Sequence, residues 1–225
     1  MRTTSAQNQL VSIIITAYNS AEYICETLES ITSQKWKELE LIITDDFSGD
    51  CTVALCRKWL LKNRERFVRA ELLTSDCNTG VSANANRGLH AAQGDWIKFI
   101  AADDTLKPNC IIDNMCWVGK NPDIKVLFSR VEVYRDTFES QNIIEIAPGV
   151  PCNSNGILAQ GRSVNSQYRM LLLSDRIHYS PSVFLHRETL LSVGGFDERF
   201  RLMEDYPLWL KLTKNGYKLY YMDKV

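Results

Sequence analysis

Apolar and polar positions alternate in blocks along the first half of the chain. Residues 10–17 form a nearly continuous, β-branched apolar run, which is typical of a strand buried on both faces. The next stretch places Ile24, Leu28 and Ile31 at helical spacing. The same pattern predicts further strands at 39–44, 68–73 and 96–100, and further helices around 53–60 and 82–92.

This alternation of strands and helices predicts an α/β fold in which most strands are parallel and joined by right-handed crossovers. In such sheets, ligands bind beyond the carboxyl ends of the strands. Polar residues stand at these predicted ends, namely Thr16, Asp45, Asp46, Asp103 and Asp104. We therefore expect the binding site at this edge of the sheet.

The second half of the chain is less regular. The sequence predicts one long strand at 126–134, short strands at 143–146 and 182–185, a loop-rich stretch at 149–161, and helices from about 187 and over 205–213. At 225 residues, we expect one domain spanning 1–225.

Charge and cysteine content exclude several classes of protein. Lys and Arg total 26 against 27 Asp and Glu, so the chain lacks the positive field expected for a partner of long nucleic acids. No apolar stretch approaches the roughly 20 residues that cross a bilayer. Seven cysteines without CxxC spacing favour reduced thiols and a cytoplasmic protein.

Asp103 and Asp104 follow the apolar strand at 96–100 and are candidates for a metal site. Paired carboxylates supply the hard oxygen ligands that Mg²⁺ or Mn²⁺ prefers, and such a cation would neutralise a nucleoside diphosphate. The alternative is a solvated turn before the helix that begins near Pro108.

A second acidic pair, Asp45 and Asp46, ends the strand at 39–44 and could accept a hydrogen bond from a base or a ribose hydroxyl. Turn chemistry, with Asp50 as a helix cap, is the alternative. Downstream, Gly80 and Asn84 belong to an amide-rich helix start suited to contacts with a base or phosphate, or simply to a glycine turn and an ordinary cap.

A third carboxylate pair, Glu204 and Asp205, follows a glycine-containing segment. Asp205 could take a proton from an acceptor hydroxyl, and Glu204 beside it could contact substrate. Trp209 is one turn further on and is a candidate for stacking on a sugar. The alternative is that the acidic pair only favours a helix N-terminus through the helix dipole.

Five blocks together resemble the family 2 glycosyltransferases of the GT-A fold. They lie in order at 11–19, 41–50, 78–88, 94–104 and 194–205 and include Thr-Ala-Tyr-Asn, Thr-Asp-Asp-Phe-Ser-Gly-Asp and Ala-Ala-Asp-Asp. The resemblance implies a single GT-A domain with a mixed, mainly parallel, Rossmann-like sheet flanked by helices. In such a domain, residues 10–104 would form the half that binds the nucleotide sugar, and residues 105–225 the half that binds the acceptor. It also implies inverting transfer of a sugar from a nucleoside diphosphate to an acceptor hydroxyl, dependent on Mn²⁺ or Mg²⁺.

The resemblance also implies roles for individual residues. Thr16, Tyr18 and Asp46 would lie near the base. One of Asp103 and Asp104 would bind the metal and the other the ribose or sugar, with Asp104 favoured as the ligand. Asp205 would be the general base, in line with the anomeric carbon and opposite the leaving diphosphate.

One position departs from the family pattern, because Ala101 stands where many members carry another aspartate. A metal held by two phosphate oxygens can manage with one protein carboxylate and waters. We expect a UDP-sugar donor, a saccharide or lipid-linked saccharide acceptor, and a role in polysaccharide or glycoconjugate synthesis. Peripheral association with the inner face of the membrane, a homodimer, and a missing C-terminal segment remain open.

Two alternatives keep a nucleotide ligand. A nucleotide-sugar-binding protein of the same fold without transferase activity is consistent with Ala101. A nucleotidyltransferase would carry a Gly-rich, basic triphosphate loop after the first strand, where this chain has Ala-Tyr-Asn-Ser-Ala at 17–21.

Overall fold

The computed structural model describes residues 9–148 and 156–225. Most of the expected loop-rich stretch at 149–161, with Cys152, lies outside the described residues. Within the described ranges, no helix combines the length and the apolar character needed to cross a membrane.

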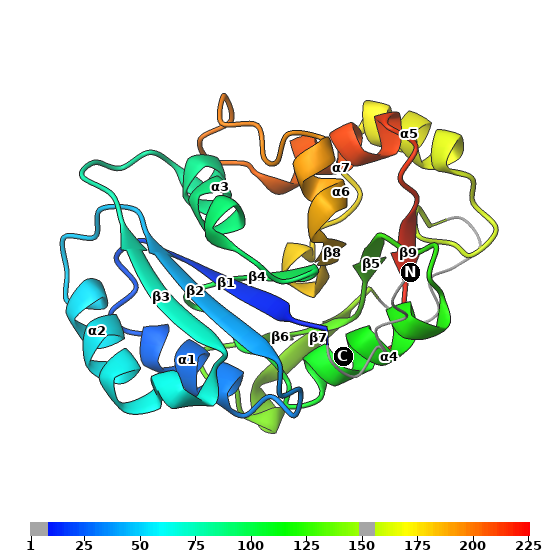
Figure 1. The fold of residues 1–225 in the computed structure, drawn as a ribbon. Helices are drawn as coiled ribbons and strands as arrows, with labels where there is room; N and C mark the ends of the chain where they lie inside the picture. Colours follow the sequence, from blue (N-terminus) through cyan, green and yellow to red (C-terminus); the bar gives the residue numbers. More distant parts are fainter. Residues whose placement is uncertain (1–8, 149–155) are drawn as a thin grey trace.

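A seven-stranded sheet forms the centre of the molecule, with strand order β3-β2-β1-β4-β8-β5-β9 (Figure 1). Its strands are β1 (Val11–Ala17), β2 (Leu39–Asp45), β3 (Arg69–Thr74), β4 (Trp96–Ala101), β5 (Val126–Phe128), β8 (Phe184–His186) and β9 (Leu219–Tyr221). The first four strands are mutually parallel, β8 runs antiparallel to β4 and β5, and β9 is parallel to β5. The predicted mixed, mainly parallel sheet is confirmed.

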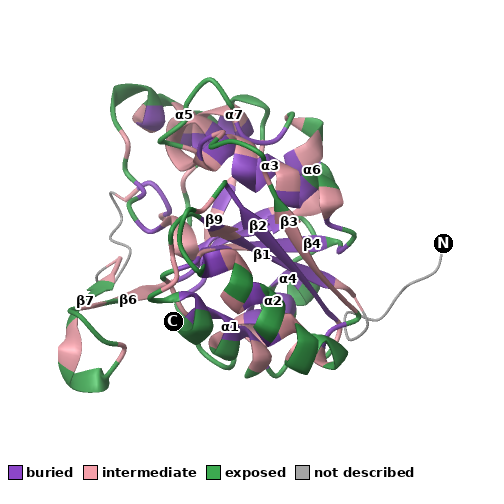
Figure 2. Cartoon of the chain, turned by 90° about the vertical axis from the view of Figure 1, so that its left-hand side faces the viewer, coloured by how far each residue is buried: buried purple, intermediate pink, exposed green. Residues whose placement is uncertain are grey.

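Helices cover both faces of this sheet. One layer contains α1 (Ile24–Thr32), α2 (Thr52–Asn63) and α4 (Cys110–Lys120), and the other contains α3 (Val81–Ala91), α5 (Val164–Leu173), α6 (Arg187–Ser192) and α7 (Asp205–Lys214). Successive side chains of β1 point to opposite faces of the sheet: Ile13 and Ile15 pack in the layer of α1 and α4, and Ile14 packs in the layer of α3. Figure 2 shows the resulting burial of the central strands.

The expected strand at 126–134 is wrong, because the chain leaves the central sheet after Phe128. The backbone N–H of Arg130 donates to the carbonyl of Lys224, and its guanidinium pairs with Asp223 at 2.6 Å. Together with the bond from the N–H of Met222 to the carbonyl of Phe128 at 2.8 Å, these contacts hold residues 128–130 against the segment after β9. The following residues form β6 (Val131–Tyr134), which pairs with β7 (Ile143–Ala147) in a separate hairpin that projects from the body (Figure 2).

Three short 3₁₀ helices join these elements: η2 (Arg64–Arg66), η3 (Ser140–Asn142) and η4 (Ser180–Ser182). Because η4 occupies the start of the strand expected at 182–185, β8 begins only at Phe184. The predicted short strand at 143–146 and the helices from 187 and over 205–213 are confirmed as β7, α6 and α7.

The strand order fixes where a ligand can bind. The chain moves from β1 to β2 on one side, and β4 then pairs with the opposite side of β1. Such a reversal opens a crevice beyond the carboxyl ends of the two strands. Thr16 lies opposite Ala101 in this register, so the residues that follow Ala101 lie at the crevice.

Candidate functional site

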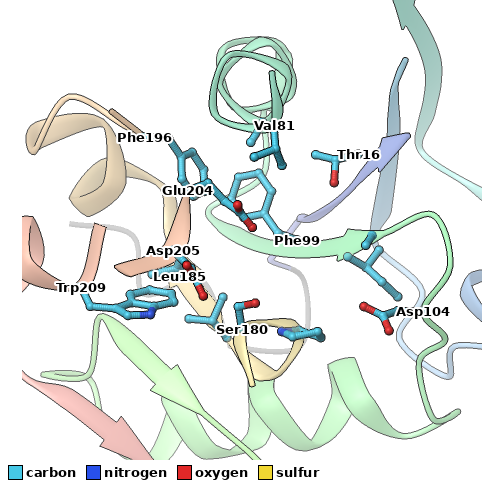
Figure 3. A pocket seen from close by; sticks show the side chains of 15 residues that line it. Thr16, Val81, Phe99, Asp104, Ser180, Leu185, Phe196, Glu204, Asp205 and Trp209 are labelled. Atoms are coloured by element: carbon cyan, nitrogen blue, oxygen red, sulfur yellow. The ribbon is translucent and has the colours of Figure 1, made fainter. Parts of the chain in front are cut away.

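A cavity of about 150 Å³ lies at this crevice (Figure 3). Its lining brings together residues from distant parts of the chain, including Thr16, Asp104, Glu204, Asp205 and Trp209. In the close view, Thr16 and Asp104 lie on one side, and Asp205 and Trp209 lie on the other. Five of the residues singled out from the sequence therefore share one cavity.

Asp104 is held in a tight turn after β4, where its backbone N–H donates to the carbonyl of Ala101 at 3.2 Å. Burial and, to a smaller extent, the neighbouring Asp103 raise the pKa of the Asp104 carboxyl to about 6, against the opposing effect of Lys98. Asp103 is exposed and lines a second cavity of about 660 Å³, which Asp104 also lines. Asp104 thus stands between the two cavities.

The acidic pair fits a divalent cation. Its ligand atoms are hard carboxylate oxygens, and the raised pKa of Asp104 means that burial and Asp103 disfavour its ionised form more than Lys98 favours it. A bound cation would stabilise that ionised form. No group of three or more Asp, Glu, His or Cys side chains suited to a metal occurs in the described part of the chain. Asp103 and Asp104 would therefore hold the ion only together with ligands from the substrate or solvent.

Glu204 and Asp205 stand at the start of α7. Burial raises the pKa of both carboxyls, and each pKa is raised further by an acidic neighbour: Asp205 acts on Glu204, and Asp175 acts on Asp205. The Asp205 carboxylate accepts the backbone N–H of Tyr206 at 2.7 Å, which orients it at the helix N-terminus. A carboxylate with a raised pKa is a stronger base than an ordinary one, which suits proton abstraction from a hydroxyl.

Trp209 is fully buried and forms part of the cavity wall (Figure 3). Its indole packs edge-on against Phe128, with ring centroids 4.9 Å apart. Among the described residues, its Nε1 has no hydrogen-bond partner. A buried indole N–H normally has an acceptor, so this atom is an unpaired donor buried behind the cavity wall.

Asp45 and Asp46 lie outside this cavity lining, on the β2 side of the crevice. Asp46 accepts the backbone N–H of Gly80 at 2.7 Å and both the N–H and the hydroxyl of Thr79, at 3.0 and 2.6 Å. Asp45 accepts the N–H and hydroxyl of Ser48. The turn alternative therefore accounts for the contacts of Asp45, whereas Asp46 anchors the loop before α3.

Gly80 allows two segments of the site to approach each other. Its φ is +94°, and a Cβ atom there would lie 2.7 Å from the carbonyl oxygen of Arg201. That carbonyl accepts the N–H of Val81 at 3.0 Å. The glycine thus lets the loop preceding Glu204 dock on the start of α3.

Asn84 and Tyr18 also lie outside the cavity lining. Asn84 is buried, and its Nδ2 donates to the carbonyl of Thr44 at 3.0 Å, which ties α3 to β2. Tyr18 follows β1 and is 52% exposed. Its ring is therefore accessible from solvent at the carboxyl end of β1.

Sequence reasoning missed Lys98, a fully buried lysine in the middle of β4. Its Nζ donates to the carbonyl of Pro181 at 2.6 Å, which fixes η4 next to the cavity. Burial lowers the pKa of this ammonium, and Asp104 acts in the opposite direction. The signal was present as a charged residue within an apolar strand, a pattern that usually requires a specific partner.

The profile of one family, glycosyl transferase family 2, matches residues 12–185. The chain belongs to this family. The match begins in β1 and ends in β8, so it contains the crevice and the Asp103–Asp104 pair, whereas Asp205 lies beyond its end.

A curated relative is the amylovoran biosynthesis glycosyltransferase AmsB of Erwinia amylovora, with 25% identity over 211 residues. The alignment covers 92% of this chain and 65% of AmsB, so this chain spans about two thirds of that relative's length.

Solved structures share the fold. The crystal structure of S. aureus TarS 1-349 in complex with UDP superposes with a TM-score of 0.72 at 21% identity, over 96% of this chain and 58% of that one. The mannosyltransferase PcManGT from Pyrobaculum calidifontis, solved with GDP-Man and Mn²⁺, gives a TM-score of 0.69 at 19% identity, over 97% and 56% of the two chains. The GT-A fold expected from the sequence is confirmed.

Proposed function

We propose that this chain transfers a sugar from a nucleoside diphosphate donor to an acceptor hydroxyl, with inversion at the anomeric carbon. The observation that carries the proposal is the placement of Asp104 and Asp205 across one cavity at the carboxyl ends of β1 and β4. A cation-binding carboxylate on one side and a basic carboxylate on the other suit in-line displacement of a diphosphate.

On the donor side, Asp104 is the proposed ligand of Mn²⁺ or Mg²⁺, and Asp103 assists it or contacts the ribose or sugar. A bound cation would supply neutralisation of the diphosphate charge. Asp103 and Asp104 then bind the donor, and the exposed ring of Tyr18 is suited to stacking on the base. UDP is the preferred nucleotide, and TarS was solved with UDP and with UDP-GlcNAc.

The remaining donor-site residues act as supports in this proposal. Asp46 and Asp45 shape the loops next to the base, and Asn84 holds α3 against β2. Thr16, at the end of β1, faces the cavity next to Asp104. Residues 10–104 thus make up the proposed donor half, and 105–225 the acceptor half.

On the acceptor side, Asp205 is the proposed general base. Its raised pKa favours removal of the hydroxyl proton as the oxygen attacks the anomeric carbon. Glu204 would bind a sugar hydroxyl, and the indole of Trp209 would form the cavity wall against which the bound sugar stacks.

Two arguments support the acceptor class: the hydroxyl that the reaction requires, and the similarity to AmsB. A saccharide or lipid-linked saccharide supplies the required hydroxyl, and AmsB acts in amylovoran biosynthesis, as its name states. We place the protein in polysaccharide or glycoconjugate synthesis for the cell envelope, in the cytoplasm or at the inner face of the membrane.

The alternative, a nucleotide-sugar-binding protein without transfer activity, is favoured only by Ala101, which removes one acidic side chain from the strand end. The two proposals differ in turnover, not in donor binding.

Two measurements test the proposal. First, the melting temperature is recorded with UDP, GDP and other nucleoside diphosphates, each with and without Mn²⁺; we expect a rise with UDP and Mn²⁺ together. If no nucleotide raises it, the donor site is wrongly assigned. Second, UDP release from UDP-sugars is followed with saccharide acceptors, and the anomeric configuration of the product is read by NMR. Release that requires an acceptor, with inverted configuration, supports the transferase, whereas binding without release supports the binding protein.

A further inference from the structure

Five large apolar side chains are exposed on two segments next to the candidate site. We call them the apolar rim: Leu172, Leu173, Phe200, Leu202 and Met203. Leu202 is 95% exposed and Leu173 is 80% exposed. Clustered apolar exposure of this kind marks an interaction surface more often than an accident of composition.

The two segments of the rim lie side by side. The hydroxyl of Tyr206, in the first turn of α7, donates to the carbonyl of Leu171 at 2.5 Å, which holds the end of α5 against the start of α7. Met203 lies three residues before Tyr206, and Leu172 follows Leu171. In both Figure 1 and Figure 2, α5 and α7 lie together on the same side of the sheet, in the layer opposite α2.

The loop that carries Leu202 is fixed by hydrogen bonds. The hydroxyl of Ser82 donates to the carbonyl of Phe200 at 2.6 Å, and the N–H of Val81 donates to the carbonyl of Arg201 at 3.0 Å. The guanidinium of Arg201 donates in turn to the carbonyl of Asn78 at 2.8 Å. The backbone thus faces α3, and Leu202 is presented to solvent.

Basic side chains accompany the apolar ones. Arg169 and Arg176 are exposed and lie one turn before and shortly after Leu172 and Leu173. The Nε of Arg176 donates to the carbonyl of Met170 at 3.4 Å, so its guanidinium lies over the end of α5. The nearest acidic side chain in sequence, Asp175, faces His178 at 3.9 Å.

We propose that the apolar rim and its two arginines dock on an anionic lipid bilayer. Convex apolar side chains next to arginines match the interface of such a membrane, where the apolar groups enter the headgroup region and the arginines meet lipid phosphates. Glu204 and Asp205 follow directly on Met203, so docking presents the cavity to headgroup level. Docking would bring the cavity close to a lipid-linked acceptor, and this consequence rests on the proposed function. The docking itself does not depend on that function.

The test is co-sedimentation of the full chain with vesicles, without donor or metal. Vesicles of phosphatidylcholine are compared with vesicles containing phosphatidylglycerol, and we expect binding only to the latter, weakened by salt. The pairs Leu172→Ser with Leu173→Ser, and Leu202→Ser with Met203→Ser, each lower the partition coefficient by about tenfold or more. Arg169→Glu with Arg176→Glu lowers it by a similar factor.

Matched controls come from the opposite layer of the molecule. Leu61, 83% exposed at the end of α2, provides the apolar control Leu61→Ser. Arg57 and Arg64, both exposed, provide the charge-reversal control. Melting temperatures of all variants are measured alongside, and because every substituted side chain is exposed we expect them to stay close to that of the unsubstituted protein.

Two results overturn the proposal. One is no binding to anionic vesicles, or binding that the α2 controls lower as much as the rim variants do. The other is self-association in sedimentation velocity runs without lipid that the rim variants abolish, because the rim is then a contact between copies of this chain. Vesicle binding without any sugar transfer would support the docking proposal and contradict the transferase proposal.

Discussion

Two Asp-Asp pairs end neighbouring regions of the same sheet, yet their surroundings differ. Asp45 and Asp46, after β2, have oxygens supplied with N–H and hydroxyl donors from Ser48, Thr79 and Gly80. Asp104 follows β4, and both its burial and the neighbouring Asp103 disfavour its ionised form, so that its pKa rises to about 6.

The contrast separates structural carboxylates from binding ones. A carboxylate that accepts several N–H and hydroxyl donors stabilises a loop, whereas one that is buried with too few donors is stabilised by a ligand or a proton. Asp205 belongs with Asp104, because burial raises its pKa although it accepts the N–H of Tyr206. The predictions below test whether these two groups behave differently.

The largest effect is expected for Asp205→Asn. An amide cannot accept the hydroxyl proton, so the transfer rate should fall by about 10²- to 10⁴-fold while UDP binding is retained. Initial rates and nucleotide-induced melting shifts measure the two quantities. Asp113→Asn on α4, in the opposite layer, is the control and should leave the rate within about twofold. A rate for Asp205→Asn within tenfold of the parent would remove its role as the base.

Asp104→Asn should stabilise the metal-free protein at neutral pH. A carboxyl with a folded-state pKa of about 6, against the ordinary 3.8, binds its proton more tightly when folded. Its contribution to stability is therefore present at low pH and lost as the pH rises from about 4 through 6. Two pKa units correspond to roughly 3 kcal/mol, so we expect a gain of about 2 to 3 kcal/mol at pH 8.

Urea unfolding at pH 5 and pH 8 measures this effect. The advantage of Asp104→Asn over the parent should shrink at pH 5, and the variant should lose the stabilisation by Mn²⁺ with UDP. An equal stability difference at both pH values would contradict the assignment of the titration to Asp104.

The regular first half of the molecule could be predicted from sequence for a physical reason. Its central strands β1 and β2 are buried on both faces, and the helices packed on them bury one apolar face, so local patterns and tertiary structure agree. The break after Phe128 could not be predicted, because Phe128 and Arg130 take hydrogen-bond partners at Met222 and Lys224, almost a hundred positions away. Long-range partners of this kind leave no local signal.

The site shows the same division. The alternation of strands and helices predicted that Thr16, Asp103 and Asp104 stand at strand ends. It did not predict how deeply each side chain is buried or which donors it meets. Two Asp-Asp pairs look identical in sequence, and only the contacts of Thr79, Gly80 and Ser48 distinguish them. The burial of Trp209 and the bond of Lys98 to Pro181 likewise depend on how distant segments pack.

Asp46→Asn should lower the free energy of unfolding, whereas Asp104→Asn should raise it. An amide keeps only one acceptor oxygen for Thr79 and Gly80, and the ion pair with Arg87 at 3.6 Å is lost. We expect a loss of about 1 to 2 kcal/mol, measured by urea unfolding at pH 8 without metal. If both variants moved stability in the same direction, the distinction between the two pairs would fail.

The smallest effect should come from Ser48→Ala. The Ser48 hydroxyl donates to Asp45 and accepts the backbone N–H of Asn19 at 2.8 Å, linking the loops after β1 and β2. Asn19 has a φ of +49°, so this bond helps to hold a conformation that few residues adopt. We expect a loss of about 1 kcal/mol in urea unfolding and no change in the melting shift caused by Mn²⁺ with UDP, because the linked loops support the site without binding the metal. A reduced shift with unchanged unfolding would instead mean that the hydroxyl contacts the nucleotide.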